Sequence, residues 1–306
     1  MNRNNLLGLL LLDKPIGITS NAALQKVKHL FVNCLGRSIR AGHTGSLDPL
    51  ASGMLPICLG EATKFSQFLL QADKRYLVTA QLGIKTSTGD AEGEIIQQAP
   101  IPILNRDDWL QIFRAFTGEI AQVPSMYSAL KHQGQPLYKL ARQGIEVARP
   151  SRIIHVYSLE LINFTAQNCQ LRVHCSKGTY IRTLIEDMGD RLGCGAHVSE
   201  LRRLTVGSHM SEQMITLPEL ETRSAQQGLL GLTSQLLPLD SMLPDWQEVI
   251  LSEATAFYLR RGQPVMIPNA PTRGWVRLTL KCNGSLVGVG EILQDGRVAP
   301  RRLLHV

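Results

Sequence analysis

The spacing of apolar residues changes along the chain, and the changes predict strands and helices in mixed order. The apolar run at residues 6–12 predicts a buried strand. Apolar residues with helical spacing over 20–31 predict an amphipathic helix with Ser20 or Asn21 as its N-cap. Residues 36–60 are rich in Gly, Ser and Pro and show neither period over most of their length. They contain too many apolar residues for a disordered segment, so they predict a packed functional loop.

The middle of the chain also contains both predicted strands and predicted helices. Alternating apolar residues predict strands at residues 76–82 and 171–175. Three further segments have a helical pattern: 61–70, 105–116 with Asn105 as cap, and 179–192 with Gly193 as stop. Strands and helices are interspersed without regular βα alternation. The pattern therefore predicts an α+β fold with a mixed, mainly antiparallel sheet flanked by helices.

The C-terminal part of the sequence is rich in predicted strands. These are residues 275–280, 286–292 and 298–304, with the turn dipeptides Asn283-Gly284 and Asp295-Gly296 between them. The Gln-, Leu- and Pro-rich segment 222–247 predicts a domain connection. We therefore expect a domain at 1–250, whose acidic end at about 207–250 leads into a small domain at 251–306.

Charge is distributed unevenly over these parts. Lys and Arg exceed Asp and Glu by 23 to 16 in residues 1–206 and by 8 to 3 in residues 251–306. In residues 207–250 they number 1 against 6. Basic lobes favour a polyanionic partner such as nucleic acid, because neutralised phosphates release counterions. The charge alone is equally consistent with a basic soluble protein.

Cysteine usage and apolar runs restrict the class of protein. The 6 cysteines form no C-x-x-C pair and have irregular spacing, so neither a disulfide framework nor a zinc site is predicted. His174 beside Cys175 suits an alternating strand better than a metal half-site. No apolar run approaches the length needed to span a bilayer. We expect a cytoplasmic protein without a membrane or metal partner.

The sequence Arg40-Ala41-Gly42-His43-Thr44-Gly45-Ser46-Leu47-Asp48-Pro49-Leu50-Ala51-Ser52-Gly53 contains the best candidate for chemistry. Its glycines and proline restrict the backbone around one carboxylate, and Pro49 biases Asp48 away from a helical conformation. A carboxylate held there acts as a nucleophile or base if it stays ionised. The alternative is an Asx turn, in which Asp48 only bonds its own backbone.

This string resembles the active-site loop of the bacterial tRNA pseudouridine-55 synthases, the TruB family. The resemblance extends in order over residues 9–206 through several further motifs. They are Leu11-Leu12-Asp13-Lys14-Pro15, Gly60-Glu61-Ala62-Thr63-Lys64, Asp73-Lys74-Arg75-Tyr76, Pro124-Ser125-Met126-Tyr127-Ser128-Ala129-Leu130-Lys131 and Cys175-Ser176-Lys177-Gly178-Thr179-Tyr180-Ile181-Arg182. Ser46 and Ser52 replace the Ala and Thr expected of the family, and the turn at residues 88–90 departs from its pattern, which leaves Asp90 without a role.

The resemblance implies isomerisation of uridine 55 in the T-arm of tRNA, without a cofactor. Asp48 would be the nucleophile, attacking C6 or C1′ or acting through a glycal. Arg182 would keep it charged and lower its pKa, whereas its sequence neighbourhood alone suggests a helix pair with Glu186. Tyr76 would stack on the uracil and is a candidate for proton handling; the alternative is ordinary cross-strand packing.

The resemblance also implies residues that bind the substrate. Tyr180 would contact the target nucleotide or its backbone, and Leu201 would pack on the base from its far side. His43 would fill the stack that the flipped base leaves, although an isolated loop histidine is more often solvent-exposed or bonded to backbone. Lys64 would support the active-site loop or a phosphate, with a solvated surface lysine as the alternative.

The motifs Gly288-Val289-Gly290-Glu291 and Pro300-Arg301-Arg302 resemble, more weakly, the PUA-type RNA-binding β-barrel. That resemblance implies contact with the tRNA acceptor end through phosphate and shape. We expect a monomeric enzyme. An RNA-binding helper of tRNA folding that acts without catalysis fits the basic lobes equally well, but it does not need the Asp48 loop. A phosphatase with an aspartate nucleophile would need further acidic residues for magnesium near Asp48.

Overall fold

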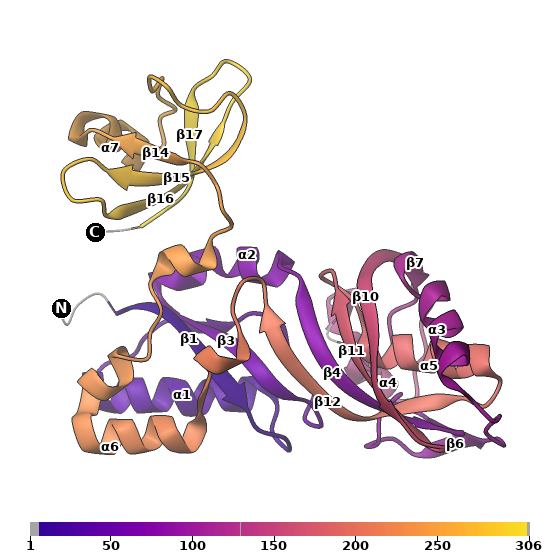
Figure 1. The fold of residues 1–306 in the computed structure, drawn as a ribbon. Helices are drawn as coiled ribbons and strands as arrows, with labels where there is room; N and C mark the ends of the chain where they lie inside the picture. The colour runs from indigo at the N-terminus through magenta and orange to yellow at the C-terminus, as the bar shows by residue number, and fades with distance from the viewer. Residues whose placement is uncertain (1–5, 129, 305–306) are drawn as a thin grey trace.

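The computed structural model describes residues 6–128 and 130–304, so Ala129 of the predicted motif lies outside it. A large twisted sheet with helices on its faces forms most of the chain, and a smaller sheet domain sits at one end (Figure 1). None of the helices in the described ranges is long and apolar enough to cross a membrane.

The four predicted helical segments are present with shifts at their ends, and α4, α6 and α7 are further helices that the sequence pattern did not predict. The bounds are α1 Ser20–Leu35, η1 Glu61–Phe65, α2 Ser66–Gln71, α3 Arg106–Ala115, α4 Leu137–Ala141, α5 Ile181–Leu192, α6 Leu217–Thr233, η2 Ser211–Gln213, η3 Leu239–Met242 and α7 Glu253–Arg260. The predicted N-cap of α1 is wrong, because the side chain of Thr19 accepts the amide hydrogen of Ala22. The predicted cap Asn105 and stop Gly193 are confirmed.

The strands are more numerous than the sequence pattern predicts. Their bounds are β1 Leu7–Lys14, β2 Ala41–His43, β3 Ser52–Gly60, β4 Lys74–Leu82, β5 Ile84–Thr86, β6 Ile95–Gln98, β7 Gly118–Gln122, β8 Lys131–His132, β9 Gln135–Pro136, β10 Arg152–Phe164, β11 Asn168–Cys175, β12 Ala196–Val206, β13 Ile215–Thr216, β14 Glu248–Leu251, β15 Gly274–Leu280, β16 Leu286–Ile292 and β17 Val298–Leu303. The large sheet runs β13-β1-β3-β12-β4-β11-β10-β7, and β2 pairs with β3. Within it only β1–β13 and β12–β3 are parallel, so the predicted mixed, mainly antiparallel sheet is confirmed.

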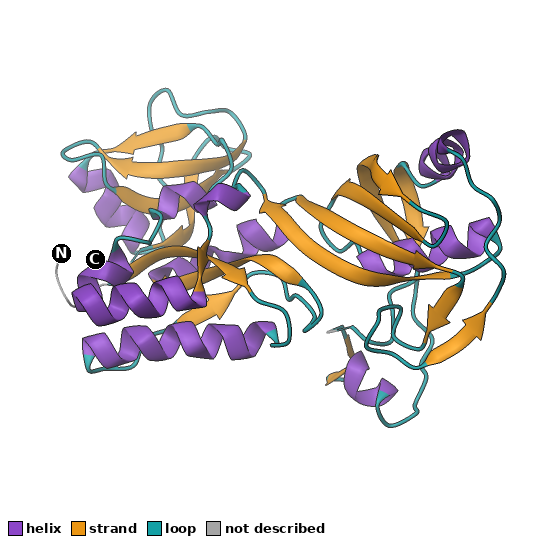
Figure 2. Cartoon of the chain, turned by 60° about the horizontal axis from the view of Figure 1, so that its bottom comes forward, coloured by secondary structure: helices purple, strands orange, loops and turns teal. Residues whose placement is uncertain are grey.

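Two segments predicted to be irregular contain regular elements. The predicted loop at residues 36–60 contains β2 and β3, and its irregular parts are residues 36–40 and 44–51. The predicted connection at residues 222–247 begins within helix α6, which packs against α1. Figure 2 shows these two helices side by side beneath the β1–β3 end of the sheet. Gly228, with φ 56°, has a non-helical backbone conformation and kinks α6.

The C-terminal domain is a sheet of order β14-β15-β16-β17 with α7 beside it. The predicted small C-terminal β domain is present, and in the described residues its strands form a four-stranded sheet that does not close into a barrel. Phe68 of α2 contacts Trp246 and Trp275 at ring-centroid distances of 5.0 and 5.8 Å. These rings join the small sheet to the large-sheet part of the chain through a shared apolar cluster.

Helix α5 packs backbone to backbone on the start of β12, and Gly189 makes this contact possible. Helix propensity alone predicts that Gly189→Ala stabilises the fold by about 0.5–1 kcal/mol. A Cβ at this position would lie 2.2 Å from the amide nitrogen of Ala196. We therefore expect Gly189→Ala to destabilise the protein by about 1–3 kcal/mol, measured as a shift in urea unfolding.

Gly42→Ala is the matched control, because an added Cβ there meets no atom within 4 Å. Its unfolding midpoint should stay near that of the parent protein. A more stable Gly189→Ala variant would contradict the close contact.

Candidate active site

The loop between β2 and β3 carries Asp48 and is held by Ser20 at the start of α1 and by Gly17 in the segment before this helix. The buried Ser20 hydroxyl accepts the amide hydrogen of Leu47 at 2.7 Å and donates to the Leu47 carbonyl at 2.9 Å. The amide of Gly17 donates to the Pro49 carbonyl at 2.8 Å. The residues immediately before and after Asp48 are thus fixed by a different part of the chain.

Arg203 of β12 fixes the two ends of the same loop. Its Nη2 donates to the Gly45 carbonyl at 2.9 Å, and its Nε donates to the Met54 carbonyl at 2.7 Å. The side chain is 1% exposed, so these carbonyls replace the water that the guanidinium loses on burial. Neither Ser20 nor Arg203 was predicted as a site residue. Their role appears only when β12 and α1 are brought together around the loop.

Asp48 faces the guanidinium of Arg182, as the resemblance implies. Nε of Arg182 lies 3.0 Å from Oδ2 of Asp48, and the Asp48 side chain keeps 42% of its surface exposed. Arg182 also donates through Nη1 to the Thr88 carbonyl at 2.8 Å and through Nη2 to the Tyr127 carbonyl at 2.7 Å. These contacts hold the guanidinium in place and leave the carboxylate accessible.

Asp90 is a second carboxylate on Arg182, and the sequence left it without a role. Its Oδ2 lies 3.4 Å from Nη1 of Arg182, and its side chain is 4% exposed. Thr88 donates to its Oδ1 at 2.6 Å, and the amide of Glu92 donates to the same oxygen at 3.1 Å. An acidic residue does therefore lie near Asp48. Even so, the part of the chain that the structure describes holds no group of three or more metal-ligating side chains.

The pKa of Asp48 differs in direction from the sequence-based expectation. Burial raises the pKa of Asp48 above its usual value, and the charge of nearby Asp90 adds to this rise. Arg182 opposes the rise by favouring the ionised form, as does Lys14. Arg182 thus acts in the predicted direction, but desolvation is the larger effect.

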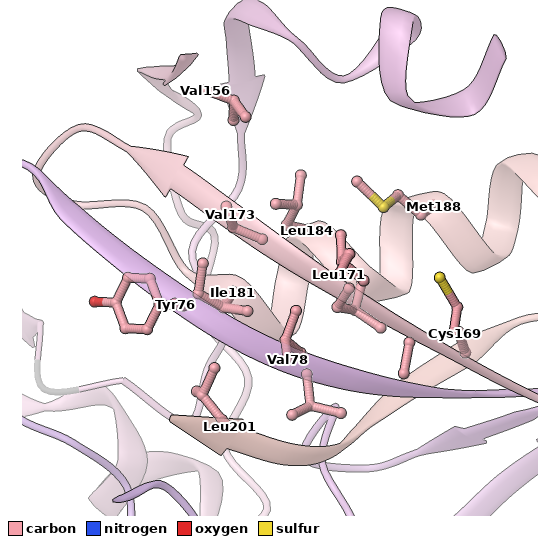
Figure 3. Close-up of a cluster of buried hydrophobic side chains, with 14 of the residues drawn as sticks. Tyr76, Val78, Val156, Cys169, Leu171, Val173, Ile181, Leu184, Met188 and Leu201 are labelled. Carbon is pink, nitrogen blue, oxygen red and sulfur yellow. The ribbon is translucent and has the colours of Figure 1, made fainter. Parts of the chain in front are cut away.

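A cleft of about 310 Å³ opens beside the Asp48 carboxylate. Its walls include Tyr76 of β4, Leu201 of β12 and Tyr180, which caps α5. The Cα partners Arg203 and Tyr76 lie opposite each other in the β12–β4 ladder, which places the tyrosine ring beside the loop. Figure 3 shows Tyr76 and Leu201 on neighbouring strands at one end of the buried cluster.

Both tyrosines of the cleft are protonated at neutral pH, and Tyr180 is also anchored through its backbone. Burial raises the pKa of Tyr76, and burial also raises the pKa of Tyr180. The Tyr180 backbone is fixed by Gln122, which donates to its carbonyl at 3.0 Å and accepts its amide hydrogen at 2.8 Å. The structure thus brings Asp48, Arg182, Tyr76, Tyr180 and Leu201 together around one space.

His43 and Lys64 are not among the residues that line this cleft. His43 lies on β2 opposite Ile57 of β3, and burial lowers the pKa of its imidazole. Lys64 lies in η1, where it pairs with Glu61 and donates to the Leu303 carbonyl at 3.0 Å. That hydrogen bond connects Lys64 to the C-terminal domain.

Buried cations near the loop are a further feature that the sequence did not reveal. Lys14 donates to the carbonyls of Pro15 and Ile18 at 2.7 and 2.8 Å and is 0% exposed. Lys74, which lines the cleft, donates to three carbonyls at the end of α2. Burial lowers the pKa of both Lys14 and Lys74 to about 8.

Comparison with known families gives a consistent match over most of the chain. Residues 33–181 match "TruB family pseudouridylate synthase (N terminal domain)". Residues 182–244 match "tRNA pseudouridylate synthase B C-terminal domain", and residues 248–304 match "Pseudouridine synthase II TruB, C-terminal". Together these matches include both the cleft and the small C-terminal sheet.

Individual proteins agree with the family matches. The chain is 57% identical over 298 residues to tRNA pseudouridine synthase B of Coxiella burnetii (strain RSA 331 / Henzerling II), covering 97% of this chain and 94% of the relative. It is 54% identical over 297 residues to the protein of the same name from Nitrosococcus oceani, with the same coverage of 97% and 94%.

Solved structures show the same fold. An H/ACA RNP bound to a substrate RNA containing 2′-deoxyuridine holds a chain with a TM-score of 0.73 and 25% identity, covering 98% of this chain and 85% of that one. A chain of a Cbf5-Nop10-Gar1 complex has a TM-score of 0.73 and 26% identity, covering 97% and 84%.

The shared guanidinium predicts how Asp48 titrates. Arg182→Gln removes the positive charge between Asp48 and Asp90, so we expect the pKa of Asp48 to rise further. The measurement is a titration of carboxyl carbons by NMR on folded protein. Arg202→Gln is the control, since Arg202 pairs with Asp13 at 2.7 Å. An Asp48 pKa that stays constant or falls in Arg182→Gln would rule out this electrostatic role.

Proposed function

Since this chain belongs to the TruB family of pseudouridine synthases and isomerises uridine in tRNA, we propose that its target is uridine 55 in the T-arm, with Asp48 as nucleophile. The observation that supports this most directly is the ion pair of Asp48 with Arg182 at the wall of a cleft. The reaction breaks the bond from uracil N1 to C1′ and joins C5 to C1′. The proton of C5 is lost and N1 gains one, so no group is transferred to or from the RNA.

The cleft residues have roles that follow from their positions. Asp48 provides the negative charge that reacts, and Arg182 orients it and favours its ionised form. Tyr76 stacks on the uracil and is the candidate for proton handling, because its hydroxyl is protonated at neutral pH. Leu201 packs on the far side of the base, and Tyr180 contacts the nucleotide or its backbone.

A base in a folded RNA loop reaches such a cleft only after extrusion, which costs a few kcal/mol of unstacking. We assign His43 to the space that the base leaves, since it lies on the strand that leads into the Asp48 loop. Burial keeps its imidazole neutral near pH 7, which suits stacking between bases. Lys64 has a supporting role here, because its hydrogen bond to the Leu303 carbonyl ties the catalytic part to the small domain.

We assign catalysis to residues 1–250 and RNA binding to the PUA-like part at residues 251–306. The latter holds 8 Lys and Arg against 3 Asp and Glu, which suits contact with the phosphates of the acceptor end. All six cysteines are free thiols, in keeping with a reducing cytoplasm, and we propose a monomer as the working unit.

Replacement of the nucleophile tests the chemistry. We expect Asp48→Asn to lower conversion of uridine to pseudouridine in unmodified tRNA by ~10³-fold or more, because the amide has no nucleophilic oxygen. Binding of the tRNA should persist, since the cleft keeps its shape. Pseudouridine mapping measures conversion at each position, and filter binding measures affinity.

Asp190→Asn is the matched control, because Asp190 is an exposed carboxylate that pairs with Lys85 at 2.8 Å on the far end of α5. It should retain full activity. Full conversion by Asp48→Asn would refute the nucleophile, whereas an unaltered protein that binds tRNA without converting any uridine would favour the RNA-folding helper. Conversion by the unaltered protein at another uridine would refute position 55.

The RNA-binding role of the small domain gives a separate prediction. Arg260, Arg273 and Lys281 are exposed on this domain, and their joint replacement by Gln removes three positive charges without touching the catalytic part. We expect weaker tRNA binding with a shallower salt dependence, because fewer counterions are released. The rate at saturating RNA should be unchanged. Unaltered affinity and salt slope would show that this face does not contact RNA.

A further inference from the structure

Three aromatic side chains form a continuous row on the surface of strands β10 and β11. The ring of Tyr157 lies 4.6 Å from that of His155 and 4.7 Å from that of His174. The ladder shifts register between Val156 and Ser158, so Tyr157 is an extra residue in the strand and lies beside its neighbour's ring. Tyr157 is 42% exposed. We call His155, Tyr157 and His174 the aromatic row.

The aromatic row borders the rim of the active-site cleft. The Tyr157 hydroxyl donates to Oδ1 of Asp73 at 3.2 Å, and Asp73 precedes the cleft residue Lys74. The amide of His155 donates to the Ser176 hydroxyl at 2.9 Å, and Ser176 donates from its amide to the His155 carbonyl at 2.8 Å. Ser176 itself lines the cleft. The row is therefore hydrogen-bonded to one residue that lines the cleft, Ser176, and to the chain neighbour of a second, Lys74.

Two exposed cations, Arg75 and Lys177, lie next to residues of the aromatic row or to its hydrogen-bond partners. Arg75 lies opposite His174 in the β4–β11 ladder, and its charge adds to the burial that lowers the pKa of the His174 imidazole. Lys177 follows Ser176 and donates to Oε1 of Gln71 at 3.4 Å. Flat rings between cations are the combination that proteins use to bind unpaired nucleotides.

We propose that the aromatic row is a stacking platform for a second, unpaired base of the RNA whose uridine enters the cleft. Arg75 and Lys177 lie where the adjoining phosphates would pass. This inference rests on the proposed function, since it takes the RNA loop as the ligand of the cleft. Its alternative is that the rings only stabilise the sheet as cross-strand neighbours, in which case their loss changes stability and not affinity.

The test compares variants of the intact chain in binding and turnover with unmodified tRNA. Tyr157→Ala should raise Kd and KM about tenfold, as expected for loss of one base–aromatic stack, while kcat stays unchanged. Tyr157→Phe keeps the ring but loses the bond to Asp73, and it should bind like the parent.

Ile162→Ala is the matched control. Ile162 is a 40%-exposed residue on the same strand, at the second register shift, between Leu161 and Asn163. It should leave Kd unchanged. Equal Kd values for Tyr157→Ala and the parent would overturn the proposal. An equal rise in Kd for Ile162→Ala and Tyr157→Ala would also overturn the proposal.

A set of T-arm stem-loops, each with one abasic site in the loop, identifies the stacked base. At one position other than the target, the missing base should weaken binding to the parent but not to Tyr157→Ala. If every abasic site weakens both proteins equally, no base stacks on Tyr157 and the proposal fails. Failure of the proposed function is distinguishable, because the parent protein would then leave the stem-loop uridine unconverted.

Discussion

The ion pair between Asp48 and Arg182 is the interaction around which the site is built. Arg182 is 7% exposed, so it has left water and needs partners for all its donors. Asp48, Asp90 and the carbonyls of Thr88 and Tyr127 supply them. Because these partners come from the Asp48 loop, the hairpin β5–β6 and the segment after β7, one guanidinium fixes three separate segments relative to each other. Of these two carboxylates, Asp48 is the accessible one, with 42% of its side chain exposed against 4% for Asp90.

The sheet determines where that ion pair can form. β12 lies between β3 and β4, and its residues reach the loop on one side and the cleft on the other. Arg203 holds the loop through the carbonyls of Gly45 and Met54, and Leu201, two residues before it on the same strand, lines the cleft. Helix α1 contributes Ser20 to the opposite side of the loop. The conformation of the loop is therefore fixed by hydrogen bonds from α1 and β12. The glycines of the loop only allow its backbone to adopt that conformation.

The features that could be predicted from the sequence are those that depend on a local residue pattern or on a recognised motif. Asn105 and Gly193 bound their helices as expected, because capping is decided within a few residues. Strand β12 was missed because adjacent arginines interrupt its apolar alternation, and nothing local shows that Arg203 is buried. Asp90 was missed for the same kind of reason, since its partner lies 92 residues further along the chain. The pKa direction of Asp48 required knowledge of burial, which no motif supplies.

The buried cations around the loop complete the electrostatic argument. Lys14, Lys74 and Arg203 each bond to backbone carbonyls, so carbonyl dipoles and not carboxylates replace the lost water. Carbonyls satisfy the hydrogen bonds but leave the positive charge uncancelled, and its field extends into the cleft. Lys14 accordingly favours the ionised form of Asp48, and Arg203 opposes the rise in the pKa of Tyr76. A carboxylate in such a field stays reactive despite its burial, and a phosphate backbone is attracted to the same place. In the function proposed above, catalysis and RNA binding therefore draw on one set of buried charges.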